Sequence, residues 1–337
     1  MLRIYYTPIH RAHHPPPGHH HPENPERVEK ALQALRRAGL LKEAQLIEPR
    51  KAAIEELEAA HERHYIEAIR ELSTAGGGWL DQDTYIAPGT WEAALRYVGA
   101  AIQALKQGDE KAVILLRPPG HHAGREGPAM GAPTLGFCIF NAAATATLNT
   151  DPDNTLILDI DVHHGNGTQE ILYDKPTPHI DIHQHPATLY PGTGWPDQTG
   201  EGEGKGTKHN IILPPGCGDD CYDWAIKTIE DIIQEYKPYT IIIDAGLDAY
   251  RGDGLADLRA TTNTYHKIGR ITTRHAHKTI IILEGGYTKG LTRALPALIA
   301  GILGKPNPHP EKPTKTPKHI LQTLTKINKT SGGPAGI

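Results

Sequence analysis

The chain has 337 residues, of which 38% are hydrophobic, and this fits one large α/β domain or two small ones. Its formal charge of −4 argues against a general nucleic-acid-binding surface, so no direct nucleic-acid binding is expected. Cys138, Cys217 and Cys221 are too few and wrongly spaced for a disulfide framework or a zinc knuckle. With no signal peptide and no apolar run long enough to span a bilayer, we expect a cytoplasmic protein without membrane contact.

The first third of the chain predicts one strand, Leu2–Thr7, followed by a loop rich in His and Pro, His10–Pro22. The loop histidines have neither a regular ligand spacing nor acidic partners, so we expect them to line a surface or the mouth of a cleft. Gly76–Gly78 interrupts the chain before Trp79–Thr84, a predicted loop. Amphipathic patterns predict four helices: Glu26–Ala38, Ala52–Ala60, Glu62–Leu72 and Thr90–Lys106.

From residue 112 onward, short apolar strands alternate with helices. Besides a central strand that starts at Leu156, the predicted strands are Ala112–Leu116, Ile180–His183, Asn210–Leu213, Thr240–Asp244 and Thr279–Leu283. The predicted helices are Phe137–Leu148, a segment starting at Thr168, Asp220–Tyr236, Thr262–His275 and Leu291–Leu303. This alternation predicts a mostly parallel sheet with helices on both faces.

The end of the chain differs in composition from the rest. Lys305–Pro317 is rich in Pro and Lys and predicts a linker, and a short helix is predicted at His319–Ile327. We therefore expect one domain over residues 1–304 and a C-terminal extension over residues 305–337.

Polar residues recur where the predicted strands end. In a parallel sheet, ligands bind beyond the carboxyl ends of the strands. Each such residue alone is commonly a cap or a loop hydrogen bond, but four groups at one edge indicate an active site. The groups are His121-His122, the triplet Asp159, Asp161 and His163, the pair Asp244 and Asp248, and Glu284-Gly-Gly-Tyr287.

The triplet at the end of the central strand is the most informative group. Asp159, Asp161 and His163 are spaced two residues apart, so on a strand they would share one side. Burying two carboxylates and an imidazole without partners would cost roughly several kcal/mol. A metal ion offsets this cost, and Asp and His ligands suit zinc. The alternative is a buried Asp–His hydrogen-bond network without an ion.

A catalytic zinc has three protein ligands and an open position. Asp161, His163 and Asp248 supply such a set, in which the metal lowers the pKa of a bound water and polarises a substrate carbonyl. The neighbouring His121 and His122 could divide the proton transfers between them.

Tyr287 follows two glycines, which let the backbone approach the site closely. Its hydroxyl could donate a hydrogen bond to a developing oxyanion. The alternative is a buried tyrosine whose role is packing.

Six motifs together resemble the zinc-dependent histone deacetylase superfamily, which includes acetoin-utilisation proteins and acetylpolyamine amidohydrolases. They are Arg117-Pro-Pro-Gly-His-His-Ala123, Gly136-Phe-Cys-Ile-Phe-Asn141, Asp159-Ile-Asp-Val-His-His-Gly-Asn-Gly-Thr168, Pro191-Gly-Thr-Gly194, Ala245-Gly-Leu-Asp-Ala249 and Glu284-Gly-Gly-Tyr287. The resemblance runs from His21 to Leu303. It implies a three-layer arginase/deacetylase-like α/β fold and removal of acetyl groups from the ε-amine of lysine by metal-activated water.

The resemblance also implies a role for each matched residue. Asp161, His163 and Asp248 match the ligands of a single zinc ion, which iron could replace in the cell. His122 matches the general base and acid, and His121 matches its electrostatic companion. The remaining matches are Asp159 and Asn166 as hydrogen-bond partners of the two histidines, and Tyr287 as the oxyanion donor. Some family members have aspartate at the position of Asn166, and the asparagine here resembles the class II branch. It should leave His122 less basic.

Further residues match the narrow tunnel that receives the acyl-lysine side chain. Gly136, Phe137 and Tyr190 match its walls, and Leu255 aligns with a position where polyamine-selective members can carry an acidic gatekeeper. Gly124–Leu135 matches no particular member, so it leaves the rim undefined. Family members also hold a monovalent cation, K⁺ or Na⁺, near the end of the central strand.

Three alternatives remain open. An arginase-like ureohydrolase would need two more acids, but Gly165 and Gly246 stand where they would be. A ligand-binding protein with a dead site is disfavoured because every matched position is filled. Acetylpolyamines or other small acylated amines could be the substrates if Asp83 or Glu126 supplied the charge that Leu255 lacks. The chain could also form oligomers.

Overall fold

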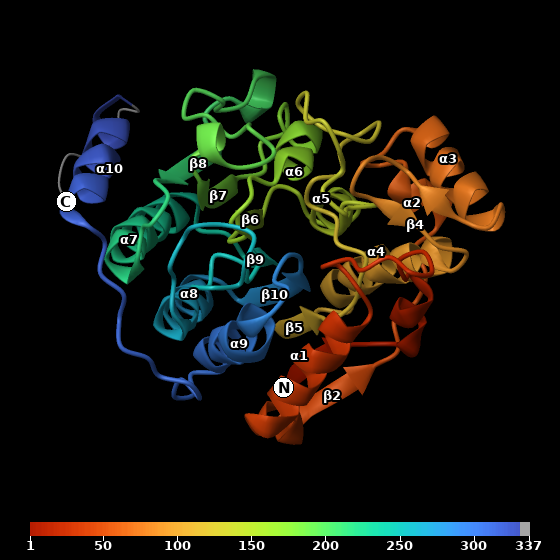
Figure 1. The fold of residues 1–337 in the computed structure, drawn as a ribbon, viewed down its shortest axis with the longest axis horizontal. Coiled ribbons are helices and arrows are strands. Elements are labelled where there is room, and N and C mark those ends of the chain that lie inside the picture. Colours follow the sequence, from red (N-terminus) through yellow and green to blue (C-terminus); the bar gives the residue numbers. More distant parts are fainter. Residues whose placement is uncertain (331–337) are drawn as a thin grey trace.

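The computed structural model describes residues 1–330 and is built on one eight-stranded sheet in the order β2-β1-β5-β10-β9-β6-β7-β8 (Figure 1). Every pairing in this sheet is parallel. The strands are β1 (Leu2–Tyr5), β2 (Ala44–Ile47), β5 (Lys111–Ile114), β6 (Thr155–Asp159), β7 (His179–Gln184), β8 (Lys208–Leu213), β9 (Thr240–Ala245) and β10 (Lys278–Leu283). The predicted parallel sheet is confirmed, and β2 is the strand that the sequence patterns missed.

Helices cover both faces of the sheet and give three layers (Figure 1). They are α1 (Glu26–Arg37), α2 (Ile54–Leu57), α3 (Arg63–Thr74), α4 (Thr90–Lys106), α5 (Ala142–Leu148), α6 (Asn166–Ile171), α7 (Asp219–Tyr236), α8 (Thr262–His275), α9 (Leu295–Ile302) and α10 (Lys318–Thr330). Over residues 1–330, none of the helices combines the length and apolar character needed to cross a membrane.

The central strands are buried on both faces because their side chains alternate between two hydrophobic cores. On β6, Leu158 belongs to the core that includes side chains of α1, α7, α8 and α9, whereas Ile157 belongs to the core that includes side chains of α3, α4 and α5. On β9, Ile243 and Ile242 divide in the same way. The alternation explains why these strands are apolar at successive positions, and it confirms the expected three-layer α/β fold.

The structure corrects several predicted element boundaries. The helix expected over Phe137–Leu148 begins only at Ala142, because Asn141 caps it by accepting a hydrogen bond from the Ala144 amide at 2.9 Å. Phe137 has a φ of 74°, which a helix does not allow. The helix expected over Ala52–Ala60 is the single turn α2.

The predicted loop Trp79–Thr84 belongs to a short antiparallel hairpin with strands β3 (Gly78–Trp79) and β4 (Tyr85–Ile86). Trp79 lies in β3, and residues 80–84 form the tip. In the His-rich loop, His10 and His13 are buried, so the expectation of a surface or cleft mouth is wrong for these two. It holds for the exposed histidines, which are His14, His19 and His20.

The C-terminal extension packs against the domain and is not a free linker. Its residues 305–317 run from the end of α9 along α8 and α7, and α10 then lies beside α7 (Figure 1). Thr314 and Thr316 are buried, and Leu324 of α10 joins the hydrophobic core. The expected helix at 319–327 is present as α10. Residues 331–337 of the predicted extension lie outside the described residues, and the division at 304/305 stays a prediction.

Candidate active site

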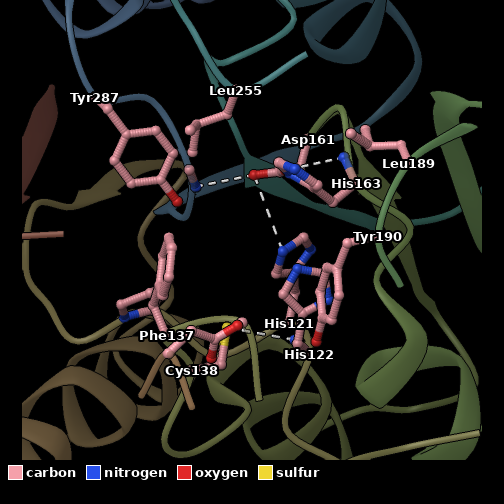
Figure 2. A pocket seen from close by; sticks show the side chains of 14 residues that line it. His121, His122, Phe137, Cys138, Asp161, His163, Leu189, Tyr190, Leu255 and Tyr287 are labelled. Atoms are coloured by element: carbon pink, nitrogen blue, oxygen red, sulfur yellow. Dashed lines mark hydrogen bonds and ion pairs between the residues drawn. The ribbon is translucent and has the colours of Figure 1, made fainter. Parts of the chain in front are cut away.

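A cavity of about 260 Å³ opens beyond the carboxyl ends of the central strands (Figure 2). It receives side chains from the segments after β5, β6 and β10 and from the loop after β9. Its lining includes nine of the twelve residues that the family resemblance matched to the site: His121, His122, Gly136, Phe137, Asp161, His163, Tyr190, Leu255 and Tyr287. The other three, Asp159, Asn166 and Asp248, lie directly behind this lining and contact it.

Asp161, His163 and Asp248 form a compact group whose donor atoms all lie within 4.8 Å of one another. His163 Nδ1 is 2.9 Å from Asp161 Oδ1 and 3.2 Å from Asp248 Oδ2. Burial lowers the pKa of His163, but the two carboxylates outweigh it and raise this pKa to about 9. Within residues 1–330, Asp248 Oδ2 has no hydrogen-bond partner. Two carboxylate oxygens and one imidazole nitrogen directed at one point fit a divalent metal ion.

The central strand is shorter than predicted, and Asp159, at its end, has a different role from Asp161 and His163, which follow it. Strand β6 ends at Asp159, and Asp161 and His163 lie in the following turn, held by hydrogen bonds from the Asp161 amide to Asp159 Oδ1 and from the His163 amide to Asp161 Oδ1. Asp159 faces His121 Nδ1, at 2.9 Å, and is not part of the group of Asp161, His163 and Asp248, which we call the metal-type group.

His121 and His122 lie side by side with ring centroids 3.9 Å apart, but their surroundings set their charges differently (Figure 2). Burial lowers the pKa of His121, but Asp159 and Asp161 outweigh it and raise this pKa well above its usual range, which favours the charged imidazole. Burial and the charges of His121 and His163 hold the pKa of His122 well below its usual range, so His122 is neutral.

Asn166 decides which nitrogen of His122 carries the proton. Its Nδ2 donates to the Ala129 carbonyl at 2.9 Å, so Oδ1 is the atom that faces His122 Nδ1, at 2.7 Å. An amide oxygen can only accept, and Nδ1 of His122 must therefore donate. Nε2 of the neutral ring is left as a proton acceptor at the cavity.

The segment Gly124–Leu135, which matched no family motif, supports this arrangement. Glu170 of α6 accepts hydrogen bonds from the amides of Arg125, at 3.1 Å, and Met130, at 2.8 Å. These contacts hold Ala129 where its carbonyl meets Asn166. The sequence carried no signal for this link, because a backbone carbonyl contributes no residue type to a pattern.

Tyr287 stands across the cavity from the histidines, and its hydroxyl points inward (Figure 2). The Arg27 guanidinium lies 4.7 Å from the centre of its ring, and Phe137 meets the ring edge-on at 5.9 Å. Burial raises the pKa of Tyr287 well above its usual range, and Arg27 only partly opposes this, so the hydroxyl stays protonated. Gly285 must lack a side chain here, since a Cβ would lie 2.3 Å from Asp161 Oδ2.

The cavity is narrow because its walls pack closely around Gly136, where even one added carbon atom would not fit. A Cβ at Gly136 would lie 2.6 Å from His122 Cδ2 and 2.8 Å from Tyr190 Cε1. Tyr190 is fixed by donating its hydroxyl hydrogen to the Thr134 carbonyl at 2.8 Å. Phe137, Leu255, Cys138 and Leu189 also line the cavity.

Asp83, which the sequence suggested only as an alternative source of charge, also lines the cavity. It accepts hydrogen bonds from the hydroxyls of Thr84, at 2.8 Å, and Thr134, at 2.7 Å, and burial raises the pKa of its carboxyl. Glu126, the other candidate, is exposed and is not among the residues that line the cavity.

Such a parallel sheet, with ligand-type and proton-transferring residues at its carboxyl edge, is the architecture of the arginase/deacetylase-like α/β class. A histone deacetylase domain matches residues 21–302. A probable deacetylase of Archaeoglobus fulgidus is 38% identical over 84% of this chain and 80% of its own length. Acetylpolyamine amidohydrolase 1 of Pseudomonas aeruginosa is 38% identical over 62% of this chain and 61% of its own.

Among solved structures, the HDA15 HD domain superposes with a TM-score of 0.85 at 30% identity, over 98% of this chain and 94% of that one. The chain therefore belongs to the histone deacetylase family. It is a hydrolase that acts on amide bonds.

Proposed function

We propose that the chain is a zinc-dependent deacetylase that removes acetyl groups from lysine side chains of peptides or proteins. The observation that carries the proposal is the compact group of Asp161, His163 and Asp248 at a narrow cavity, beside one histidine bound to a carboxylate and one bound to an amide oxygen. These three residues would hold the zinc ion. When bound, zinc supplies a Lewis acid that polarises the acetyl carbonyl and lowers the pKa of the attacking water.

The two histidines would manage the protons of the reaction. His122 is neutral and has Nε2 free, so it accepts a proton from the attacking water while Asn166 stabilises its Nδ1–H. The same Nε2 then returns the proton to the departing amine. His121, charged and bound to Asp159, remains an electrostatic companion that favours the negative charge of the intermediate.

Tyr287 would donate its hydroxyl hydrogen to the acetyl oxygen as negative charge develops there. Its protonated state and its position opposite the histidines support this role. The walls formed by Phe137, Tyr190 and Gly136 suit the unbranched stem of an acyl-lysine and exclude water from the reacting amide.

Leu255 favours acyl-lysine over acetylated polyamines, because a leucine at the mouth offers a second ammonium no partner and would desolvate it. Acetylpolyamines are the second candidate, and the observation that favours them is Asp83. The Asp83 carboxylate already accepts two hydrogen bonds from hydroxyl groups, and its raised pKa weakens its charge. We therefore place the acetylpolyamines second. A comparison of acetate release from acetyl-lysine peptides and acetylspermidine tests the choice.

A ureohydrolase finds no support in the geometry. A Cβ at Gly246 would lie 2.0 Å from Asp161 Oδ2, and one at Gly165 would lie 2.3 Å from Asp159 Oδ2. Acidic side chains for a second metal therefore cannot be placed at either position. We infer one zinc ion per chain, which elemental analysis can count and distinguish from iron.

A monovalent cation, K⁺ or Na⁺, is proposed near the end of β6. Asp159 lies in register with Asp181 on β7 and Asp244 on β9, and all three carboxylates are fully buried. Burial and the neighbouring carboxylates raise the pKa of Asp244. A bound cation would offset this concentration of negative charge. Measuring activity in K⁺, Na⁺ and a bulky organic cation tests the proposal.

A further inference from the structure

The family match ends at residue 302, but the chain continues as a strap that packs against the loop carrying Leu255. We call residues 305–317 the C-terminal strap and residues 249–261, between β9 and α8, the tunnel loop. The tunnel loop begins directly after Asp248 of the metal-type group. Whatever sets its position therefore acts beside the candidate active site.

Hydrogen bonds pair the two sides of the tunnel loop at its base, and its tip contributes to the cavity. At the base, the Arg251 amide donates to the Ala260 carbonyl at 2.9 Å, and the Ala260 amide donates to the Ala249 carbonyl at 3.1 Å. At the tip, Leu255 lines the cavity. A rigid base thus determines where the tip can lie.

Asp253, also at the tip, connects the tunnel loop to Tyr287. Its carboxylate is buried and accepts hydrogen bonds from the amides of Tyr287, at 2.7 Å, Thr288, at 3.0 Å, and Gly290, at 2.9 Å. These three bonds place the backbone from which the Tyr287 ring extends. A shift of the loop would therefore move one tunnel wall and the oxyanion donor together.

The strap holds one side of the base through Glu311. One oxygen of its buried carboxylate accepts hydrogen bonds from the Tyr250 hydroxyl at 2.7 Å and from Arg293 Nε at 2.9 Å. The other oxygen lies 3.8 Å from Arg251 Nη2. Tyr250 and Arg251 form the first side of the base, so Glu311 joins this side to Arg293, which follows Tyr287 by six positions.

The strap holds the other side of the base through Thr314. Its hydroxyl donates to the Arg259 carbonyl at 2.6 Å. Its amide donates at 2.7 Å to the buried Asp219, whose other oxygen accepts from the Thr261 amide at 3.0 Å. Both sides of the base are thus bound to the same short stretch of the strap.

We propose that the C-terminal strap positions the active site: Glu311 and Thr314 clamp the base of the tunnel loop, so that Leu255 closes the tunnel and Asp253 holds Tyr287. Glu311 and Thr314 are positioning residues and touch no substrate. The inference rests on the proposed function for its effect on catalysis, but the clamp itself can be measured without any reaction.

The test compares Glu311→Ala and Thr314→Val with a matched control in the same strap, Thr316→Val. Thr316 is buried to the same degree as Thr314, but its hydroxyl accepts from the Gly218 amide at 2.8 Å and donates to Asp220, which precede and start α7. In the full chain, the two clamp variants should lower kcat for an acetyl-lysine peptide by about tenfold, because small misplacements of catalytic groups are costly. Thr316→Val should lower Tm comparably and leave kcat unchanged, and Glu311→Gln should restore most of the turnover.

Hydrogen exchange gives the second readout, which is independent of activity. Glu311→Ala should speed exchange at residues 249–261 and 287–290, whereas Thr316→Val should speed it at residues 214–222. If the wild type releases no acetate from any acylated substrate, the proposed function fails, and the exchange pattern alone decides the clamp. The inference is wrong if exchange at 287–290 is unchanged in Glu311→Ala, or if Thr316→Val loses as much kcat as the clamp variants.

Discussion

Replacing Tyr287 by phenylalanine isolates one hydroxyl group in the proposed mechanism. The ring contacts survive the change, because Arg27 lies over the ring face at 4.7 Å and Phe137 meets it at 5.9 Å, and neither contact uses the hydroxyl. The backbone stays in place because Asp253 holds the amide of residue 287. Tyr287→Phe should therefore fold and bind metal as the wild type does.

Catalysis should respond strongly to the same change. Removal of one oxyanion donor typically costs roughly 10²–10³ in turnover, or about 3–4 kcal/mol of transition-state stabilisation. We expect kcat for an acetyl-lysine peptide to fall by this factor with little change in KM, since the hydrogen bond strengthens only as charge develops.

The assay is steady-state acetate release, run beside metal content and thermal unfolding. Tyr65→Phe is a matched control: it removes a tyrosine hydroxyl that donates to the Ile139 carbonyl at 2.7 Å, away from the cavity. The control should lose about 1 kcal/mol of stability and no turnover. A Tyr287→Phe enzyme with normal metal content and near-normal kcat would remove Tyr287 from the mechanism.

Three further predictions concern the metal, the proton acceptor and the tunnel mouth. Asp161→Asn or Asp248→Ala should lose metal and activity together, and two metals per fully active chain, counted by elemental analysis, would contradict the single-site assignment. Asn166→Asp places a carboxylate beside Nδ1 of His122 and raises its pKa; because His122 acts as a base only when neutral, the acid limb of the kcat/KM profile should move to higher pH, and an unmoved limb would count against His122 as the base. Acetyl-lysine peptides should have a higher kcat/KM than acetylpolyamines, and Leu255→Glu should shift the ratio toward the polyamines; a wild-type preference for polyamines of about tenfold, or about 1.4 kcal/mol, would show that the Leu255 argument is wrong.

The strand pattern and the strand-end residues were predictable from the sequence because they depend on local rules. Alternate burial on both faces makes β6 and β9 continuously apolar, and parallel strands bring their carboxyl ends to one edge. The spacing of Asp161 and His163, with Asp248 after another strand, therefore indicated one shared site before any contact was known.

Local rules were insufficient where a distant partner decides the conformation. Phe137–Leu148 has a helical pattern, but Phe137 lies in the cavity wall with a φ of 74°. The helix therefore begins only after its N-cap, Asn141. Likewise, Lys305–Pro317 has the composition of a linker, yet Glu311 and Thr314 form hydrogen bonds with the tunnel loop.

The ionisation of the two histidines shows the same division most clearly. Their adjacency at 121 and 122 was visible in the sequence, and so were the residue types of their partners. The family resemblance already implied Asp159 and Asn166 as the partners of these histidines. The tertiary structure added the atoms and distances of these contacts, and it showed that the Ala129 carbonyl fixes the orientation of the amide. Sequence patterns determine which chemical groups reach the end of a strand, whereas pKa values and proton positions depend on distances of a few ångströms between segments far apart in the chain.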